Sequence, residues 1–129
     1  MIKEFNISTN KRCELIDITR EVEKIVKESG VKEGLAFIFL PHSTASLLLT
    51  ENEPGLKKDW LKFFEKMVSK MAFEHNKIDN NADSHLLSGL IGQSRTLIIK
   101  EAKLIRGTWQ NIFLAEFDGP RRRKIIVKI

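Results

Sequence analysis

The sequence predicts an α+β domain with a mainly antiparallel sheet. Extended segments precede, separate and follow the helical segments, and the last extended segments are joined by short turns. Helices and strands do not alternate regularly, and the chain contains no GxGxxG and no P-loop motif, which argues against the nucleotide-binding α/β folds. The 129 residues suit a single domain, spanning residues 1–129, with one hydrophobic core.

The first half of the chain is predicted to form strands around one helix. Residues 2–7 alternate apolar and polar side chains, and residues 13–18 form a second extended piece. An amphipathic helix follows directly and ends at Gly30. The apolar run at residues 35–40 is typical of a buried strand, and residues 43–51 are expected to form the next one.

The second half begins with a helix and ends with a group of strands. Pro54 and Gly55 interrupt the chain, and residues 56–71 then repeat apolar side chains at helical spacing, which indicates packing against the core. The polar residues 74–83 form a predicted loop, and residues 84–90 a short helix. Three strands are expected to close the chain, at residues 96–101, 104–118 and 123–129.

The composition is that of a globular protein with a basic charge. Hydrophobic residues make up 42% of the chain, and the mean hydropathy is -0.21. The net charge of +5 and the pI near 9.4 favour anionic partners such as phosphates. Nucleic acid is the weaker expectation, because the chain has no Tyr and its Phe and Trp residues mostly fit core stripes.

Two features favour a reducing cytoplasm and argue against a membrane. The single cysteine, Cys13, has no partner for an internal disulfide. The N-terminus lacks the apolar segment of a signal peptide, and no apolar run approaches the ~20 residues that a membrane helix needs. We therefore expect a cytoplasmic protein without a membrane partner.

Acidic residues at two strand ends suggest a site. Glu51 and Glu116 each extend the apolar face of a predicted strand and come just before a turn that contains Pro and Gly. Because an unpartnered buried charge is very costly, these carboxylates either reach solvent or meet partners in a shared cleft. The pattern alone leaves both alternatives open.

Basic and histidine side chains suggest two further kinds of site. The run from Arg121 to Lys124 either covers a solvated edge strand or binds phosphate through its guanidinium groups. Strand alternation allows at most two of these side chains to serve one site. The three histidines, His42, His75 and His85, match no local metal motif such as HExxH, and each alone is more often structural.

Three blocks of sequence resemble the YjbQ family, also called UPF0047. They are HSTASLLLTENEPG, EHNKIDNNADSHL with the following GLIGQS, and GTWQNIFLAEFDGPRRRK, and the resemblance runs from about Gly34 to the C-terminus. It implies a β-sandwich-like core with two to three helices, a homotrimer, and a polar cleft drawn from these blocks. The chain departs from the family pattern at Asn80-Asn81-Ala82-Asp83 and in its short C-terminal end.

The resemblance also implies an activity, that of a secondary thiamine-phosphate synthase. Such a small transferase would join hydroxymethylpyrimidine diphosphate to hydroxyethylthiazole phosphate and release pyrophosphate. The alternative is a non-catalytic module that binds a phosphorylated metabolite or nucleotide. Whether the chain is an enzyme is therefore open, with the transferase favoured. In both cases the expected partner is a phosphorylated small molecule.

The resemblance further implies the residues of this cleft. The catalytic residues would be His42, His85 and Glu116. A divalent metal, Mg or Zn, would be held by His42, His75 and His85. The substrate-binding residues would be Ser43, Thr44, Glu51, Asn52, Asn81, Gly107, Thr108, Gln110, Asp118 and Arg121.

Overall fold

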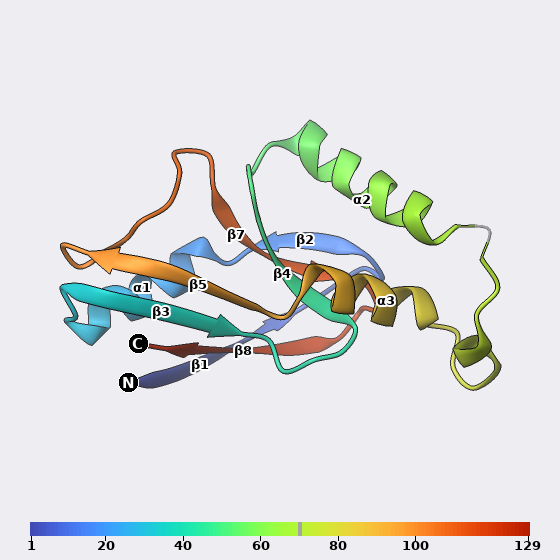
Figure 1. Cartoon of the computed structure of the whole chain (residues 1–129), viewed down its shortest axis with the longest axis horizontal. Helices are drawn as coiled ribbons and strands as arrows, with labels where there is room; N and C mark the ends of the chain where they lie inside the picture. Colours follow the sequence, from blue (N-terminus) through green and yellow to red (C-terminus); the bar gives the residue numbers. More distant parts are fainter. Residues whose placement is uncertain (70) are drawn as a thin grey trace.

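Two antiparallel sheets pack face to face in this protein (Figure 1). The structure is a computed structural model, which describes residues 1–69 and 71–129. The five-stranded sheet has the order β1 (Ile2–Ser8), β8 (Arg122–Lys128), β3 (Glu33–Phe39), β5 (Ser94–Lys100), β6 (Lys103–Leu104). The three-stranded sheet has the order β2 (Glu14–Asp17), β7 (Asn111–Glu116), β4 (Ala45–Thr50). The neighbouring strands described here pair in the antiparallel sense, which confirms the predicted α+β fold.

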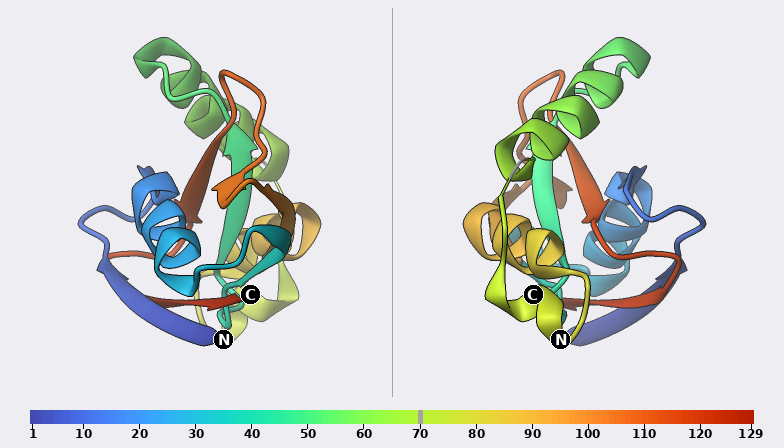
Figure 2. Two further views of the ribbon diagram at one scale, coloured as in Figure 1. Left: turned by 90° about the vertical axis from the view of Figure 1, so that its left-hand side faces the viewer. Right: turned by 90° about the vertical axis from the view of Figure 1, so that its right-hand side faces the viewer.

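Helices cover one end and one face of this sandwich (Figure 2). They are α1 (Thr19–Ser29), α2 (Pro54–Val68) and α3 (Ala82–Ile91), with a short 3-10 helix, η1 (Glu74–Lys77), between the last two. Val22 and Ile25 of α1 join the core between the sheets. Phe64 of α2 and Leu87 of α3 join a second cluster on the outer face of the three-stranded sheet. No helix within the two described ranges is long and apolar enough to cross a membrane.

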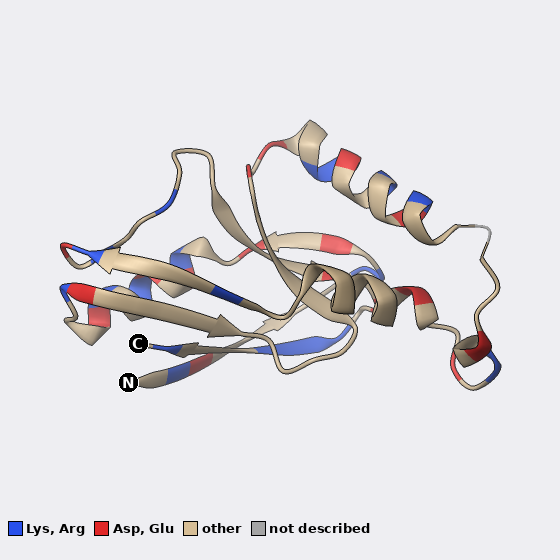
Figure 3. Cartoon of the chain, in the orientation of Figure 1, with Lys and Arg blue, Asp and Glu red and all other residues tan. Residues whose placement is uncertain are grey.

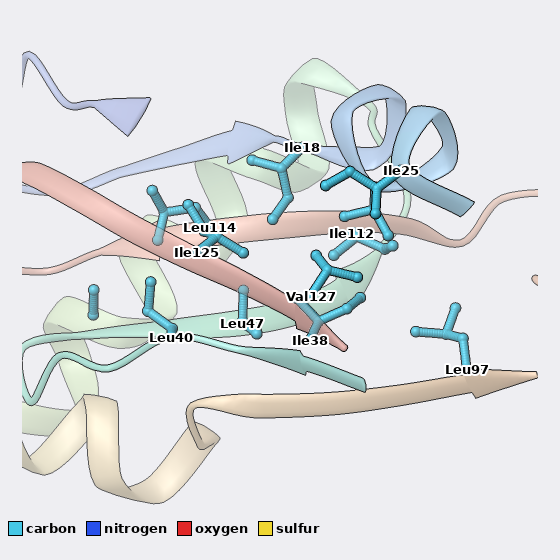
Figure 4. Close-up of a cluster of buried hydrophobic side chains, with 12 residues drawn as sticks. Ile18, Ile25, Ile38, Leu40, Leu47, Leu97, Ile112, Leu114, Ile125 and Val127 are labelled. Atoms are coloured by element: carbon cyan, nitrogen blue, oxygen red, sulfur yellow. The ribbon is translucent and has the colours of Figure 1, made fainter. Parts of the chain in front are cut away.

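The main core lies between the two sheets, and strand alternation selects its residues (Figure 4). Ile112 and Leu114 of β7 belong to it from one sheet, and Ile125 of β8 belongs to it from the other. The intervening Phe113 packs with the helices instead. Full burial of such a side chain contributes about 1.5–3 kcal/mol. Ile112 and Leu114 of β7 therefore share one buried face.

The predicted strand at residues 104–118 is wrong at its start, because β6 ends at Leu104 and β7 begins only at Asn111. A tight turn lies between them. In this turn the Gly107 N–H donates to Gln110 Oε1 at 2.8 Å, and the Gln110 N–H donates to the Gly107 carbonyl at 3.0 Å. These local bonds satisfy the backbone without a neighbouring strand, so the chain can leave the sheet here.

The predicted helix at residues 56–71 begins and ends earlier than expected. Glu53 caps its N-terminus, since the carboxylate accepts hydrogen bonds of 2.8 and 2.6 Å from two backbone N–H groups of the first turn. Pro54 is the first helical residue, where its missing N–H needs no partner. The helix ends at Val68, and Lys70 of the predicted range lies outside the described residues.

The polar segment at residues 74–83, predicted as a loop, is partly helical. It contains η1, and α3 begins at Ala82 rather than at residue 84. The early start is stabilised by a side chain from η1, because Asn76 Oδ1 accepts a hydrogen bond of 3.0 Å from the Ala82 N–H.

The pairing of β4 with β7 decides which polar strand ends meet. Ala45 pairs with Glu116, and Thr50 pairs with Asn111. At about 3.4 Å per residue, the two ends of this strand pair lie roughly 17 Å apart. The start of β4, the end of β7 and the turn into β8 therefore share one end of the sandwich, whereas Glu51 lies at the other.

Substitution of two buried serines should affect the stability of the protein differently. Ser88 Oγ of α3 donates to the Ala45 carbonyl and accepts from Gln93 Nε2 at 2.8 Å, whereas Ser46 Oγ has no hydrogen-bond partner among the described residues. Ser88→Ala is expected to lower the free energy of unfolding by about 1–3 kcal/mol, because a buried carbonyl loses its donor. Ser46→Ala should change it by less than about 0.5 kcal/mol or raise it. Urea denaturation measures both, and a greater loss in Ser46→Ala would contradict the expectation.

Candidate functional site

A cleft of about 710 Å³ opens at the end of the sandwich where β4 begins and β7 ends. Three pieces of chain form it: the turn from β3 into β4, the start of α3, and the turn from β7 into β8. Figure 3 shows the start of β8 as a basic segment. The lining residues are Pro41, His42, Ser43, Thr44, Asn81, His85, Asp118, Pro120, Arg121, Arg122 and Arg123.

A buried ion pair supports the basic wall of this cleft. The side chain of Arg123 is 3% exposed and that of Glu116 is 0% exposed. Arg123 Nε donates to Glu116 Oε1 at 2.9 Å, and Nη2 donates to Oε2 and, at 2.9 Å, to Thr44 Oγ1. The guanidinium is thus held at two of its three nitrogens. The third, Nη1, has no acceptor among the residues that the structure describes.

Both carboxylate oxygens of Glu116 are occupied. Besides Arg123, Oε1 accepts from Thr9 Oγ1 at 2.8 Å, and Oε2 accepts from the N–H groups of Phe117 at 3.1 Å and Asp118 at 3.2 Å. Glu116 therefore positions Arg123, and its expected catalytic role stays a prediction. Its side chain orients Arg123 from inside the domain and is not part of the cleft lining.

His42 presents one tautomer beside the arginines. Its Nε2 accepts a hydrogen bond of 2.9 Å from the Lys124 N–H. The proton of the neutral ring therefore sits on Nδ1, which can only donate. Burial, followed by the positive charge of Arg123, lowers the pKa of His42. The imidazole is thus a fixed hydrogen-bond donor at neutral pH, whereas the proposed catalytic use of this residue stays a prediction.

Stability should fall below about pH 6.5 because of His42. The unfolded chain takes up a proton near that pH, whereas the folded chain resists it, since an imidazolium cannot accept from the Lys124 N–H. The neutral ring of His42 contributes to the free energy of unfolding above the unfolded-state pKa. This contribution is lost as the pH falls from there through the lower folded-state pKa. Thermal unfolding between about pH 8 and pH 5 should depend less on pH in His42→Gln than in the unmodified chain. An identical pH dependence would exclude this role.

A second wall of the cleft is built around Asp118 and Asn81. Asn81 Nδ2 donates to Asp118 Oδ2 at 2.9 Å, which leaves Asn81 Oδ1 to accept from His75 Nε2 at 2.8 Å. Arg121 Nη2 also donates to Asp118 Oδ2, at 3.1 Å. Burial alone would raise the pKa of Asp118, but the hydrogen bonds from Asn81 and Arg121 outweigh it and lower the pKa. This wall therefore carries a carboxylate that stays ionised.

The three histidines are only partly brought together. The rings of His75 and His85 meet edge to face with their centroids 4.9 Å apart, and His85 and His42 line the same cleft. However, Nε2 of His42 and Nε2 of His75 already have partners. No group of three or more His, Cys, Asp or Glu side chains in the described part of the chain is arranged to hold a metal ion. The histidines thus form no preassembled metal site, and the expected divalent metal stays a prediction.

The predicted substrate-binding residues divide between the two ends of the sandwich. Those that line the cleft are Ser43, Thr44, Asn81, Asp118 and Arg121. Those at the opposite end are Glu51, Asn52, Gly107, Thr108 and Gln110. At that end Asn52 Nδ2 donates to Asp17 Oδ2 at 2.9 Å. Within this chain the second group lies apart from the cleft, because antiparallel pairing separates the end of β4 from the end of β7. The expected substrate-binding role of these residues stays a prediction.

Sequence reasoning missed part of the basic wall. Strand alternation predicted that at most two side chains of the run from Arg121 to Lys124 serve one site. In the structure Arg121, Arg122 and Arg123 all line the cleft. Arg121 escapes the alternation, because β8 begins at Arg122 and Arg121 belongs to the preceding turn. The run also lies on an inner strand, between β1 and β3, and not on an edge. Thr9 had no local signal, because its bond to Glu116 joins residues 107 positions apart.

Comparisons with known proteins agree on one family. The chain matches the family model described as UPF0047 protein YjbQ-like over residues 3–129. A UPF0047 protein of Methanocaldococcus jannaschii is 47% identical over 131 residues, which cover 100% of this chain and 94% of that protein. The UPF0047 protein YugU of Bacillus subtilis is 41% identical over 133 residues, or 100% and 98% of the two chains. The crystal structure of a YbjQ-like protein of unknown function from Sulfolobus solfataricus P2 is 44% identical with a TM-score of 0.96, covering 98% of this chain and 94% of that one.

These relatives correct the activity implied by the resemblance. They are named as UPF0047 proteins, and the Sulfolobus structure as a protein of unknown function, and none of these names indicates thiamine-phosphate synthesis. The expected transferase that joins hydroxymethylpyrimidine diphosphate to hydroxyethylthiazole phosphate is therefore wrong as an assignment. The function is therefore inferred from the chemistry of the residues that line the cleft.

Proposed function

The chain belongs to the UPF0047 YjbQ-like family, and from the cleft at the start of β8 we propose that it binds a small phosphorylated molecule. The observation that carries this proposal is the Arg123 guanidinium, whose Nε and Nη2 are held by Glu116 while Nη1 is left for a ligand. A guanidinium fixed in this way loses little freedom when an anion binds, and its charge-assisted hydrogen bonds to phosphate are strong.

Further donors and a net positive charge support the same ligand class. His42 supplies the Nδ1–H group beside Arg123. Arg123 is balanced by Glu116 and Arg121 by Asp118. Arg122 has no ion-pair partner in the part of the chain that the structure describes, so it leaves one positive charge uncompensated at the cleft. An oxyanion is therefore favoured at this wall over a neutral or cationic group.

Arg122→Ala is expected to weaken the binding of inorganic phosphate about 10- to 100-fold, since a hydrogen bond to a charged group contributes roughly 1.5–3 kcal/mol. Isothermal titration calorimetry at low salt measures the dissociation constant. Arg20→Ala is the matched control, because Arg20 is an exposed arginine of α1 that lines a different pocket. Its affinity for phosphate should not change. Equal losses in the two variants, or no phosphate binding by the unmodified chain, would disprove the proposal.

The remaining expectations about partners stay predictions. They are a homotrimer, a cytoplasmic location and the absence of a nucleic-acid partner. Sedimentation equilibrium measures the first. A titration with DNA and RNA at increasing salt addresses the last, because binding through phosphate contacts weakens steeply with salt.

A further inference from the structure

We infer that the ligand of this cleft carries a hydrogen-bond donor, an amino or hydroxyl group, close to its phosphate. The inference rests on the proposed phosphate binding and adds a second chemical group to the ligand. It follows from the second wall of the cleft, where Asp118 and Asn81 lie.

Asp118 is only partly engaged by the protein. Its side chain is 12% exposed and lines the cleft. Oδ2 accepts from Asn81 and Arg121, at 2.9 and 3.1 Å. Oδ1 has only Arg12 Nη1, at 3.8 Å, which is an ion pair beyond hydrogen-bond distance. Across the described residues, Oδ1 therefore lacks a hydrogen-bond donor, and a ligand in the cleft can supply one.

The wall that carries Asp118 disfavours a second negatively charged group of the ligand, in addition to its phosphate. An ionised carboxylate accepts hydrogen bonds and never donates them, and the partners of Asp118 keep it ionised. The neighbouring Asn81 adds at most one neutral N–H donor, because the other N–H of its Nδ2 donates to Asp118 and its Oδ1 accepts from His75. A negative group of the ligand would be repelled here, whereas an N–H or O–H group would complete the hydrogen bonding of Oδ1.

The cleft thus has two chemically different walls within one small volume. Arg122, Arg123 and His42 offer donors to an oxyanion, and Asp118 offers an acceptor. The volume of about 710 Å³ lies within the range of roughly 300–1,000 Å³ that is usual for small-molecule sites. A compact phosphomonoester with a donor group can contact both walls, whereas an ester of equal size without a donor contacts only one.

Three esters of nearly equal size test this inference on the unmodified chain. O-phosphoethanolamine ends in an amino group, 2-hydroxyethyl phosphate in a hydroxyl group and n-propyl phosphate in a methyl group. Their dissociation constants are measured by calorimetry, together with that of inorganic phosphate. At least one donor-bearing ester is expected to bind about tenfold more tightly than n-propyl phosphate. The ester with the lower constant tells an amino group from a hydroxyl group.

Asp118→Asn provides the second measurement, with its folding checked by circular dichroism. In this variant the ratio of dissociation constants between n-propyl phosphate and the preferred ester should fall towards one. Equal constants for all three esters in the unmodified chain would overturn the inference while leaving phosphate binding intact. An unchanged ratio in folded Asp118→Asn would also overturn it. Failure of inorganic phosphate to bind would instead overturn the proposed function.

Discussion

Glu116→Ala is expected to lower the free energy of unfolding by about 3–5 kcal/mol. The substitution removes the carboxylate that accepts hydrogen bonds from Arg123, from Thr9 and from two backbone N–H groups. The Arg123 guanidinium then stays buried without its counter-ion. Losing one partner of a buried pair costs more than the intact pair contributes, because the remaining charge has been taken out of water. Urea unfolding followed by circular dichroism measures the loss.

A double substitution separates the charge effect from simple loss of packing. Glu116→Leu combined with Arg123→Met removes both charges and should recover most of the stability. The same double variant should lose phosphate binding, because Nη1 is absent. Glu74→Ala is the control, since its ion pair with Lys77 is exposed and should contribute nothing measurable. Equal stabilities of Glu116→Ala and Glu74→Ala would show that the buried pair does not hold this wall together.

Gly119→Ala is expected to cost at least about 3 kcal/mol or to prevent folding. A Cβ at this position would lie 2.2 Å from the Lys11 carbonyl oxygen and 2.8 Å from Thr9 Oγ1. The Lys11 oxygen belongs to the backbone, and the Gly119 N–H donates to the Arg12 carbonyl at 3.0 Å, so two segments of chain would have to separate. That movement would also displace Thr9, which donates to Glu116.

Gly89→Ala is the matched control for this clash. Gly89 lies in α3, is exposed, and a Cβ built on it has no neighbour within 4 Å. Because alanine favours a helix more than glycine does, this variant should gain about 0.5–1 kcal/mol. Thermal denaturation of the two variants should therefore show shifts of opposite sign. A Gly119→Ala chain as stable as the unmodified one would show that the turn into β8 can move away from residues 9–12.

The types of residue in the cleft could be predicted, and so could part of their grouping. His42, Asp118 and Arg121 were expected in one site, and they line one cleft. Glu51 and Glu116 looked alike in the sequence, since each extended an apolar strand face towards a turn. The structure exposes the first and buries the second, because Thr9 and Arg123 meet only Glu116. Thr9 lies 107 positions from Glu116, so no local motif links the two, whereas Arg123 lies seven positions away, across the turn into β8.

The sequence by itself determined the class of fold, most strands and the residues that face the core, because strand and helix periodicities are local properties that a short window contains. The tertiary structure decided which strand ends meet. The bonds that build the cleft join residues far apart, such as His42 with Lys124 over 82 positions and Thr9 with Glu116 over 107. No local pattern specifies such pairs, because they depend on the order of strands in the sheets and on the antiparallel register of β4 with β7.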